Sequence, residues 1–333
     1  MLTERKTALL KTLIGEYIES ASPVASESVT KKHSLGVSSA TVRNYMADLE
    51  DHGYITRPHH SSGAVPSDKG YRFYVESLAD NGNLPEDFQY SARDQLKKAE
   101  QDIEVWTHLA ATVLAQFVNN AAVVTYPRQP VSKVLRINLV HVQESLAFLV
   151  VVLEAVKLRK QLLPLTRPLS SDDMQKFSNK LTDSMVGLNR WEIMERSITA
   201  SELERTVTDR VLDIMETEDQ ESYRNHYVEG LRHLVNQPEF SQGDKAREIV
   251  AIFEDKDLPR VISSEAPATG RMKVIIGTEN HSESLRPLSM VLCQYGLPGG
   301  GLGSVGALGP TRMEYSRTIA GVRFISSLLT EVM

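Results

Sequence analysis

The first 75 residues carry three amphipathic segments followed by two strand-like segments around a polar turn. Apolar residues of the first segment recur every three or four positions, and this spacing predicts a helix that buries one face. Thr3 stands just before this segment, where it can cap the helix. The apolar stripe consists of Leu9, Leu10, Leu13, Ile14, Tyr17 and Ile18.

Two more helices are expected after a break at Pro23. The second is predicted over residues 24–32, and a third opens at Ser38 and ends at Gly53. The same three- and four-residue spacing marks the core-facing side of the third helix. Its core-facing residues are Val42, Tyr45, Met46 and Leu49.

A hairpin pattern follows the third helix directly. Residues 54–57 and 64–66 are strand-like, and the polar residues 58–63 between them are typical of a turn. Three helices followed by a hairpin predict a winged helix-turn-helix domain over residues 1–80, which is a DNA-binding fold.

The third helix begins with small polar residues, which suit a helix whose N-terminus enters the major groove of double-stranded DNA. Ser38, Ser39 and Thr41 offer hydroxyl groups to phosphates or bases. Arg43 can pair with guanine and Asn44 with adenine. We predict these five side chains as DNA contacts, while a capping serine and two solvated polar residues remain the alternative.

Further DNA contacts are predicted around this helix. Two lysines close the second helix, an arginine ends the first strand, and the tip of the wing is polar and can reach phosphates or the minor groove. A metal site at the paired histidines is not expected, because adjacent strand residues point to opposite faces. These additional candidates are Lys31, Lys32, Arg57, His59, His60, Ser61 and Ser62.

The charge of the chain is divided unevenly. The whole chain has a net charge of −6, whereas residues 1–75 carry nine cations against eight acids and so about +1. The remainder therefore carries about −7, which places a polyanionic partner at the N-terminal end. Because +1 is a weak electrostatic footprint, recognition must depend on geometry.

Several protein classes are excluded or disfavoured by composition. The apolar run 146–153 is far shorter than the roughly 20 residues of a membrane-spanning helix, and the charged N-terminus does not resemble a signal peptide. We therefore expect a cytoplasmic protein. The single cysteine, Cys293, excludes a disulfide framework and is expected to be buried and inert.

An enzymatic role is not expected. Residues 301–306 formally match a dinucleotide-binding fingerprint, but Pro298 and Pro310 flank the segment, and a fingerprint must follow a strand and open a helix. A loop leading into a strand fits better. We identify no catalytic serine, carboxylate pair or phosphate-binding lysine, and we expect no cofactor.

Residues 80–85 are rich in turn formers and predict a linker. The run 146–153 is apolar throughout, as expected of a strand covered on both faces, and the acidic run at 216–221 is expected to be a solvated face. The other predicted elements are a helix over 91–119, a strand at 135–139, a mainly helical stretch over 172–253, strands at 272–276 and 290–292, and a helix over 311–329.

Several motifs together resemble the heat-inducible transcription repressor family HrcA. N-terminal motifs that carry the resemblance are Leu2-Thr3-Glu4-Arg5, Ser22-Pro23-Val24, the segment 37–44, Met46-Ala47-Asp48-Leu49-Glu50 and the segment 65–75. Two C-terminal motifs also match, Ile276-Gly277-Thr278-Glu279-Asn280 and the segment 309–315. The resemblance therefore spans essentially the whole chain.

The resemblance implies an α+β multidomain protein, in which a GAF-like α/β domain holds an inserted, mostly helical dimerisation domain. We expect the winged helix at 1–80, a linker at 81–90, the two parts of the GAF-like domain at 91–190 and 267–333, and the insertion at 191–266. The resemblance further implies a homodimer that represses chaperone genes by binding an inverted-repeat operator. It also implies that the repressor loses activity on heating and that its activity depends on a GroEL-type chaperonin. The alternative is a regulator whose GAF-like domain binds a small molecule.

This sequence departs from the family pattern near the expected DNA contacts. Ala64 stands where most members have an arginine in the wing, Tyr45 replaces a glutamate, and Ala25 replaces a glycine. The missing wing arginine predicts that the wing contributes less to DNA binding here than in relatives.

Overall fold

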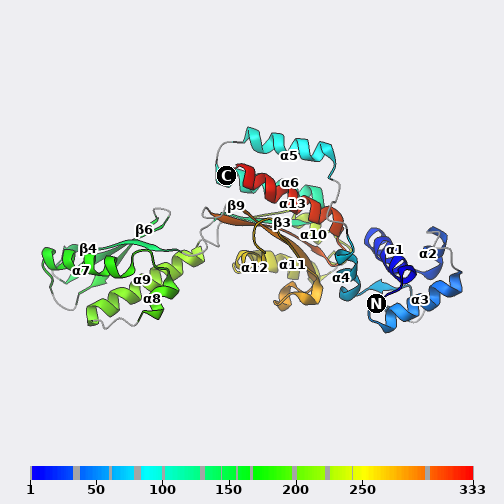
Figure 1. Ribbon diagram of the computed structural model, residues 1–333, viewed down its shortest axis with the longest axis horizontal. Helices are drawn as coiled ribbons and strands as arrows, with labels where there is room; N and C mark the ends of the chain where they lie inside the picture. The colour runs from blue at the N-terminus through cyan, green and yellow to red at the C-terminus, as the bar shows by residue number, and fades with distance from the viewer. Residues whose placement is uncertain are drawn as a thin grey trace. The chain divides into compact units, whose positions relative to one another are not determined.

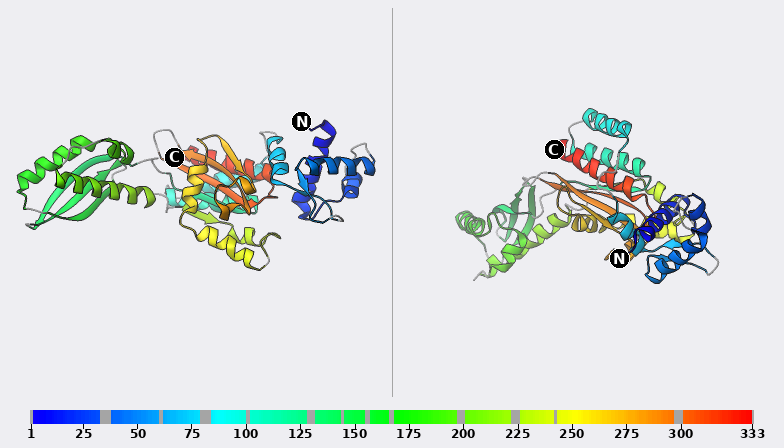
Figure 2. Two further views of the ribbon diagram at one scale, coloured as in Figure 1. Left: turned by 90° about the horizontal axis from the view of Figure 1, so that it is seen from below. Right: turned by 45° about the vertical axis from the view of Figure 1, so that its right-hand side comes forward.

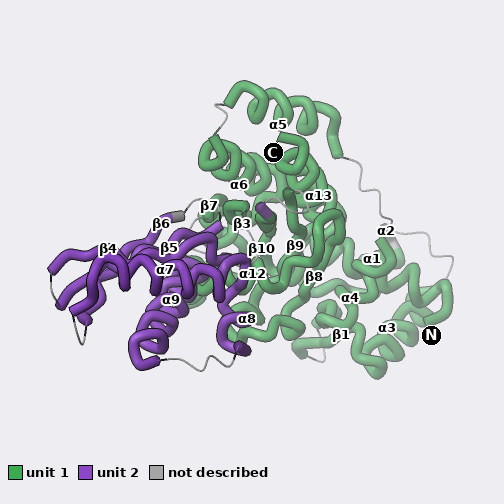
Figure 3. The backbone as a smooth tube through the Cα atoms, turned by 60° about the vertical axis from the view of Figure 1, so that its left-hand side comes forward, with its two compact units in different colours: residues 1–127, 226–298, 302–333 green, residues 128–225, 299–301 purple. Residues whose placement is uncertain are grey.

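The computed structural model forms two compact units, shown in Figure 3. Unit 1 comprises residues 1–127, 226–298 and 302–333, and unit 2 comprises residues 128–225 and 299–301. We call residues 2–78 the N-terminal region, the rest of unit 1 the central region, and unit 2 the inserted unit. The structure describes residues 2–32, 38–59, 62–78, 84–99, 102–127, 132–143, 145–154, 157–165, 168–196, 201–221, 226–241, 243–296 and 301–332.

The N-terminal region has the predicted order of three helices and a hairpin (Figure 1). Leu9, Leu13 and Leu49 are fully buried, as the helical spacing indicated. Thr3 occupies the N-cap position of the first helix, but its hydroxyl makes no capping hydrogen bond. The elements are α1 (Glu4–Ser20), α2 (Ser26–Lys32), α3 (Ser39–Asp51), β1 (Ile55–Thr56), β2 (Val65–Pro66) and α4 (Asp68–Glu76).

The central region is built on a five-stranded antiparallel sheet with the order β7-β3-β10-β9-β8. Two of these strands, β3 and β7, were not predicted from the sequence, and β7 interrupts the stretch expected to be mainly helical. The strands are β3 (Ala121–Thr125), β7 (His226–Glu229), β8 (Met272–Ile275), β9 (Leu288–Gly296) and β10 (Leu302–Pro310).

Helices cover both faces of this sheet (Figure 1 and Figure 2). Val124 packs in a core with α6 and α13, whereas its neighbour Val123 packs in another with α11 and α12. The two cores follow from the alternation of side chains along a strand. The helices are α5 (Glu86–Lys98), α6 (Ile103–Val118), α10 (Leu231–Val235), α11 (Asp244–Glu254), α12 (Leu258–Glu265) and α13 (Tyr315–Val332).

The prediction of a single helix over 91–119 is wrong, because this stretch contains parts of two separate helices, α5 and α6. Ala99 is extended after α5, and the Asp102 carboxylate accepts a hydrogen bond from the Glu104 amide to cap α6. A capping carboxylate satisfies an amide at the start of a new helix, so it favours a break that apolar spacing alone does not reveal.

The glycine-rich segment 301–306 was expected to be a loop leading into a strand, but its residues from 302 onward already lie in β10, which pairs antiparallel with β9. A Cβ atom added at Gly303 would lie 2.3 Å from the ring of Tyr295, so the glycine allows that ring to cross the strand. The glycines therefore lie within a strand, whereas a dinucleotide-binding fingerprint requires them in the turn between a strand and a helix. Cys293 on β9 is buried, as predicted.

The inserted unit contains a three-stranded antiparallel sheet with the order β4-β5-β6. Helices pack against one face of the sheet, and the buried residues of both layers form a separate core. The elements are β4 (Val134–Gln143), β5 (Leu146–Leu153), β6 (Lys157–Pro164), α7 (Ser171–Met185), α8 (Arg190–Glu195) and α9 (Glu202–Glu221).

The predicted insertion covers residues 191–266, whereas the inserted unit of the structure covers residues 128–225 and 299–301. Strands β4 to β6 pair only with one another and not with the central sheet, so they belong to the insertion. Conversely, α11 and α12 pack on the central sheet and belong to the central region. The insertion is therefore an α+β unit rather than a mostly helical one.

Two expectations for the inserted unit are corrected. Along β5, Ala147, Leu149, Val151 and Leu153 are buried while the alternate residues are only half-buried, so this chain covers one face of the strand rather than both. The acidic run at 216–221 is not simply a solvated face. Glu218 is fully buried and accepts a hydrogen bond from Arg159.

Candidate nucleic-acid interface

The start of α3 combines a structural cap with exposed polar residues. The Ser38 hydroxyl accepts a hydrogen bond from the Thr41 amide at 3.2 Å and lies 3.0 Å from the Thr41 hydroxyl. Ser39, Arg43 and Asn44 are exposed on the same helix. Ser38 therefore acts as an N-cap, which is one of the alternatives considered from the sequence, and its use in DNA contact stays a prediction.

Arg43 has partners that a nucleic acid can replace. Its Nε lies 3.4 Å from the Ser26 hydroxyl, and its Nη2 lies 3.5 Å from the Glu27 carboxylate. Both charged side chains are 64% exposed. Exposed pairs of this kind contribute at most about 1 kcal/mol, so Arg43 can exchange Glu27 for a phosphate or a base.

Arg57 lies near Arg43 at the base of the hairpin. Its Nη1 is 3.4 Å from the Glu50 carboxylate, and both side chains are partly exposed. Arg43 and Arg57 line a cleft of about 470 Å³ together with Ser26, Glu27 and Ser62. Two guanidinium groups, each within 3.5 Å of a glutamate carboxylate, therefore lie beside one cleft.

The described part of the wing turn is closed by its own hydrogen bonds. The Ser62 amide and hydroxyl both donate to the His59 carbonyl, at 2.9 and 2.8 Å, and the His59 amide donates to the Ser62 hydroxyl. The Ser62 hydroxyl therefore shapes the turn. His60 and Ser61 lie outside the described residues, as do the side chains of Lys31 and Lys32 in α2.

Ala64 lies at the base of the hairpin, not at its tip. Its side chain is fully buried, and its amide and carbonyl pair with Val24 at 2.8 and 2.9 Å. The Cβ atom of an arginine at this position would lie in a buried site, unlike that of a residue at the exposed tip of the wing. Replacing Ala64 therefore perturbs the attachment of the wing as well as its charge.

Sequence reasoning missed a set of contacts between the N-terminal and central regions. Asp68 and Arg72, on α4, hydrogen-bond to Thr278 and Glu279 of the central region. Asp68 and Arg72 lie in one motif of the family resemblance, and Thr278 and Glu279 lie in another. These two motifs were the only indication in the sequence that the residues matter. Nothing in sequence spacing indicated that residues more than 200 positions apart would meet.

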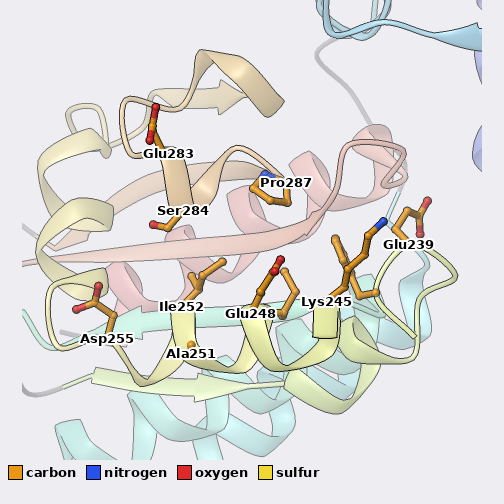
Figure 4. Close-up of a pocket in the computed structure, with 11 residues that line it drawn as sticks. Glu239, Lys245, Glu248, Ala251, Ile252, Asp255, Glu283, Ser284 and Pro287 are labelled. Atoms are coloured by element: carbon orange, nitrogen blue, oxygen red, sulfur yellow. The ribbon is translucent and has the colours of Figure 1, made fainter. Parts of the chain in front are cut away.

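The central region also carries a groove of about 730 Å³ between α11 and the segment 283–287 (Figure 4). Ile252 lies on its α11 side, and Ser284 and Pro287 lie opposite. Lys245 accompanies four acidic groups around the groove, which are Glu239, Glu248, Asp255 and Glu283.

Among the helices that the structure describes, none is long and apolar enough to cross a membrane. Over the same residues, His, Cys, Asp and Glu side chains do not gather in groups of three or more that could hold a metal ion.

Comparison with known proteins relates the chain to one family. Residues 105–319 match the family model described as the HrcA protein C terminal domain. The chain is 37% identical to the heat-inducible transcription repressor HrcA of Dehalococcoides mccartyi, covering all of this chain and 96% of the relative. It is 34% identical to the protein of the same name from Chloroflexus aurantiacus, covering 94% of that relative.

A solved structure described as a hypothetical protein shares the fold, with a TM-score of 0.58 and 24% sequence identity. The match covers 99% of this chain and 97% of that one.

The cap at Ser38 generates a stability prediction. Replacing Ser38 by Ala removes the acceptor of the Thr41 amide, and we expect a loss of about 1 kcal/mol in the local stability of α3. Ser38→Asn should retain most of that stability, because asparagine also caps helices. Amide hydrogen exchange in α3 measures the effect. The matched control is Ser39→Ala, and equal exchange in both alanine variants would show that the cap is unimportant.

Proposed function

The chain belongs to the heat-inducible transcription repressor family HrcA, and we propose that it represses chaperone genes by binding an inverted-repeat operator as a homodimer. The observation that carries this proposal is the exposed polar start of α3, which is followed directly by a hairpin. In a winged helix-turn-helix domain, the N-terminal residues of such a helix contact base edges.

Four of the predicted contacts have distinct roles in this proposal. Arg43 leaves Glu27 to pair with a base in the major groove, and Asn44 reads a neighbouring base. Ser39 and the cleft beside Arg57 hold backbone phosphates, which set the register of the protein on the duplex. The role of the altered wing is secondary, because the wing arginine of most family members is absent and Ala64 is buried.

Footprinting on DNA upstream of its own gene and of chaperonin genes tests the proposal. We expect a protected inverted repeat with half-sites about one or two helical turns apart. Arg43→Ala and Asn44→Ala should each weaken binding to this repeat by about 1–3 kcal/mol. Arg247→Ala, an exposed arginine of the central region, is the matched control. Protection without an inverted repeat, or equal loss in the control, would contradict the proposal.

The uncovered face of the three-stranded sheet supports a homodimer. Register places Val140, Phe148 and Leu162 side by side across the three strands. Val152 and Leu158 are paired on the same face. Val140, Leu158 and Leu162 are 48%, 60% and 51% exposed. In the described residues, the helices of the inserted unit pack on the opposite face.

Polar residues also lie on this face, because Asn138 and Lys160 flank Val150 and Arg136 pairs with Val152. The apolar residues therefore follow β5 through the middle of the face, and exposed apolar surface of this kind is typical of an interaction site. A second copy of the same sheet offers a self-complementary apolar surface about a twofold axis. Such a partner would cover the outer face of β5, which explains its uninterrupted apolar sequence. A twofold dimer also matches the symmetry of an inverted repeat.

The dimer proposal predicts that charge on this face separates the protomers. Leu162→Glu and Phe148→Glu should yield monomers in sedimentation velocity experiments, because each variant would bury an unpaired carboxylate in the interface. Tyr90→Glu changes an exposed aromatic residue on α5 and should remain dimeric. A monomeric parent protein, or dimeric sheet variants, would disprove this interface.

Heat control is proposed to act through folding. A native state of marginal stability can be repopulated by a GroEL-type chaperonin, so the supply of free chaperonin sets the amount of active repressor. Heating diverts the chaperonin to unfolded clients and leaves its genes derepressed. This role requires no catalytic activity, and it places the protein with its DNA in the cytoplasm.

Operator binding after a heat pulse tests this control. We expect binding activity to fall after the pulse and to recover more fully with chaperonin and ATP than without them. An unrelated protein at the same concentration controls for nonspecific protection. Complete and lasting recovery without chaperonin would contradict the proposal.

A second candidate function is small-molecule sensing by the central region, which we propose to be GAF-like. The groove between α11 and residues 283–287 favours it. Its acidic rim suits a cationic molecule with an apolar body. A molecule of that kind that raises the melting temperature and changes operator affinity would favour sensing over chaperonin control.

A further inference from the structure

Helix α4 is firmly attached to the rest of the N-terminal region. The Ser67 hydroxyl caps it by accepting the Gly70 amide at 3.1 Å, and donates to the Gly53 carbonyl at 2.6 Å. Lys69 donates to the His52 carbonyl at 2.8 Å. These bonds connect α4 to the segment that joins α3 to the hairpin, so α4 is attached directly to the end of α3.

The first turn of α4 also contacts the central region. One oxygen of the Asp68 carboxylate accepts hydrogen bonds from the Thr278 amide at 2.9 Å and the Thr278 hydroxyl at 2.6 Å. Gly277 has a φ of +49°, and a Cβ atom there would lie 2.6 Å from the Asp68 carboxylate oxygens. A glycine is therefore required on two grounds, its backbone conformation and the close approach of Asp68.

One turn further along α4, Arg72 makes a two-pronged contact with Glu279. Its Nε donates to one carboxylate oxygen at 2.8 Å and its Nη2 donates to the other. The same Nη2 donates to the Val274 carbonyl at 2.7 Å. A bidentate arginine contact fixes orientation as well as distance, because the guanidinium and the carboxylate are both planar.

The segment that receives α4 is itself well anchored. The two N–H groups of the buried Asn280 amide are shared among the carbonyls of Gly277, Leu285 and Leu288, which all lie within 3.1 Å of its nitrogen. Glu279 accepts the Ile276 amide at 2.9 Å. Burial raises the pKa of Glu279, but the hydrogen bonds from Arg72 and Ile276 outweigh it and hold the pKa below its usual value. The carboxylate facing Arg72 therefore stays charged at neutral pH.

A third contact involves the end of α1. Arg312 follows β10, and its side chain is only 12% exposed. Its Nη1 donates to the Ile18 carbonyl in the last turn of α1 at 3.1 Å, while its other nitrogens hydrogen-bond to Gln237 and Glu239. Carbonyls in the last turn of a helix lack helical partners, so an arginine there satisfies an otherwise open acceptor.

These contacts define a polar joint, consisting of Asp68, Arg72, Thr278, Glu279 and Arg312. The joint holds the helices that flank α3 at two separate points, through α4 and through α1. Two points of directional hydrogen bonding restrict rotation more than one apolar contact does. The nearby rings of Tyr71 and Tyr315, with centroids 6.0 Å apart, add packing between the same two regions.

We propose that the polar joint sets the orientation of α3 on the central region, and that Asp68, Arg72 and Arg312 are positioning residues for binding both halves of an operator. This inference rests on the proposed function. A dimer gains affinity from its second half-site only when both recognition helices reach the DNA at once. A loosened joint loses that gain while each α3 keeps its own contacts.

The test compares two DNA probes and one measurement without DNA. Arg72→Gln and Thr278→Val weaken the joint from its two sides. The matched control is Arg93→Gln, which breaks the Arg93–Glu331 ion pair within the central region. Affinity is measured for the footprinted inverted repeat and for a duplex with a single half-site. Retained half-site affinity shows that each variant still folds.

The measurement without DNA is a distance distribution between spin labels at Asp51→Cys on α3 and Lys256→Cys in the central region. Cys293→Ala provides the background, and excess unlabelled protein leaves one labelled protomer in each dimer. We expect a narrow distribution in the parent protein and the control, and a broad one in both joint variants.

We expect both joint variants to lose at least about tenfold in affinity for the intact repeat and less than about twofold for the half-site. Equal losses on the two probes, or unchanged affinity for the repeat, would overturn the proposal. If the parent protein binds no inverted repeat, the proposed function fails. The distances between the spin labels then decide alone whether the polar joint orients α3. Broadening then supports the joint as an orienting contact, and unchanged distributions overturn it.

Discussion

The pairing of β3 with β7 is the constraint on which the rest of the structure depends. Val123 lies opposite Val228 in this antiparallel pair, although about 100 residues separate the two positions in the chain. The pair brings the two ends of the insertion together, so residues 128–225 can form a unit with its own core. It also completes the sheet whose two faces hold α6 and α13 on one side and α11 and α12 on the other.

Local sequence pattern predicted the parts of the fold that depend on near neighbours. The stripe along α1 and the turn signals around β1 and β2 were sufficient for the three helices and the hairpin, but α4 was not predicted. The pattern failed where distant pairing decides the outcome. Strand β7 has only four residues and owes its conformation to β3. The apolar run of β5 correctly predicted a strand, but not that one of its faces would be uncovered within the chain.

The same division applies to the candidate site. The small polar start of α3 was visible in the sequence, and Arg43 and Asn44 are exposed there. The capping role of Ser38 was one of the alternatives, and the hydrogen bond from the Thr41 amide shows it. DNA contact by Ser38 stays a prediction. Asp68 and Thr278 could not be connected from spacing, because their contact depends on the complete central sheet. Net charge was a poor guide, because a sum of about +1 does not show that Arg43 and Arg57 lie beside one cleft.

The central claim is that α3 reads the major groove of an operator through Arg43. Methylation interference at guanine N7 tests this most directly, because N7 lies in the major groove. The account predicts that methylated guanines in each half-site block binding of the parent protein, and that Arg43→Ala becomes indifferent to at least one of them. Interference confined to adenine N3 in the minor groove, or an unchanged pattern in Arg43→Ala, would contradict it.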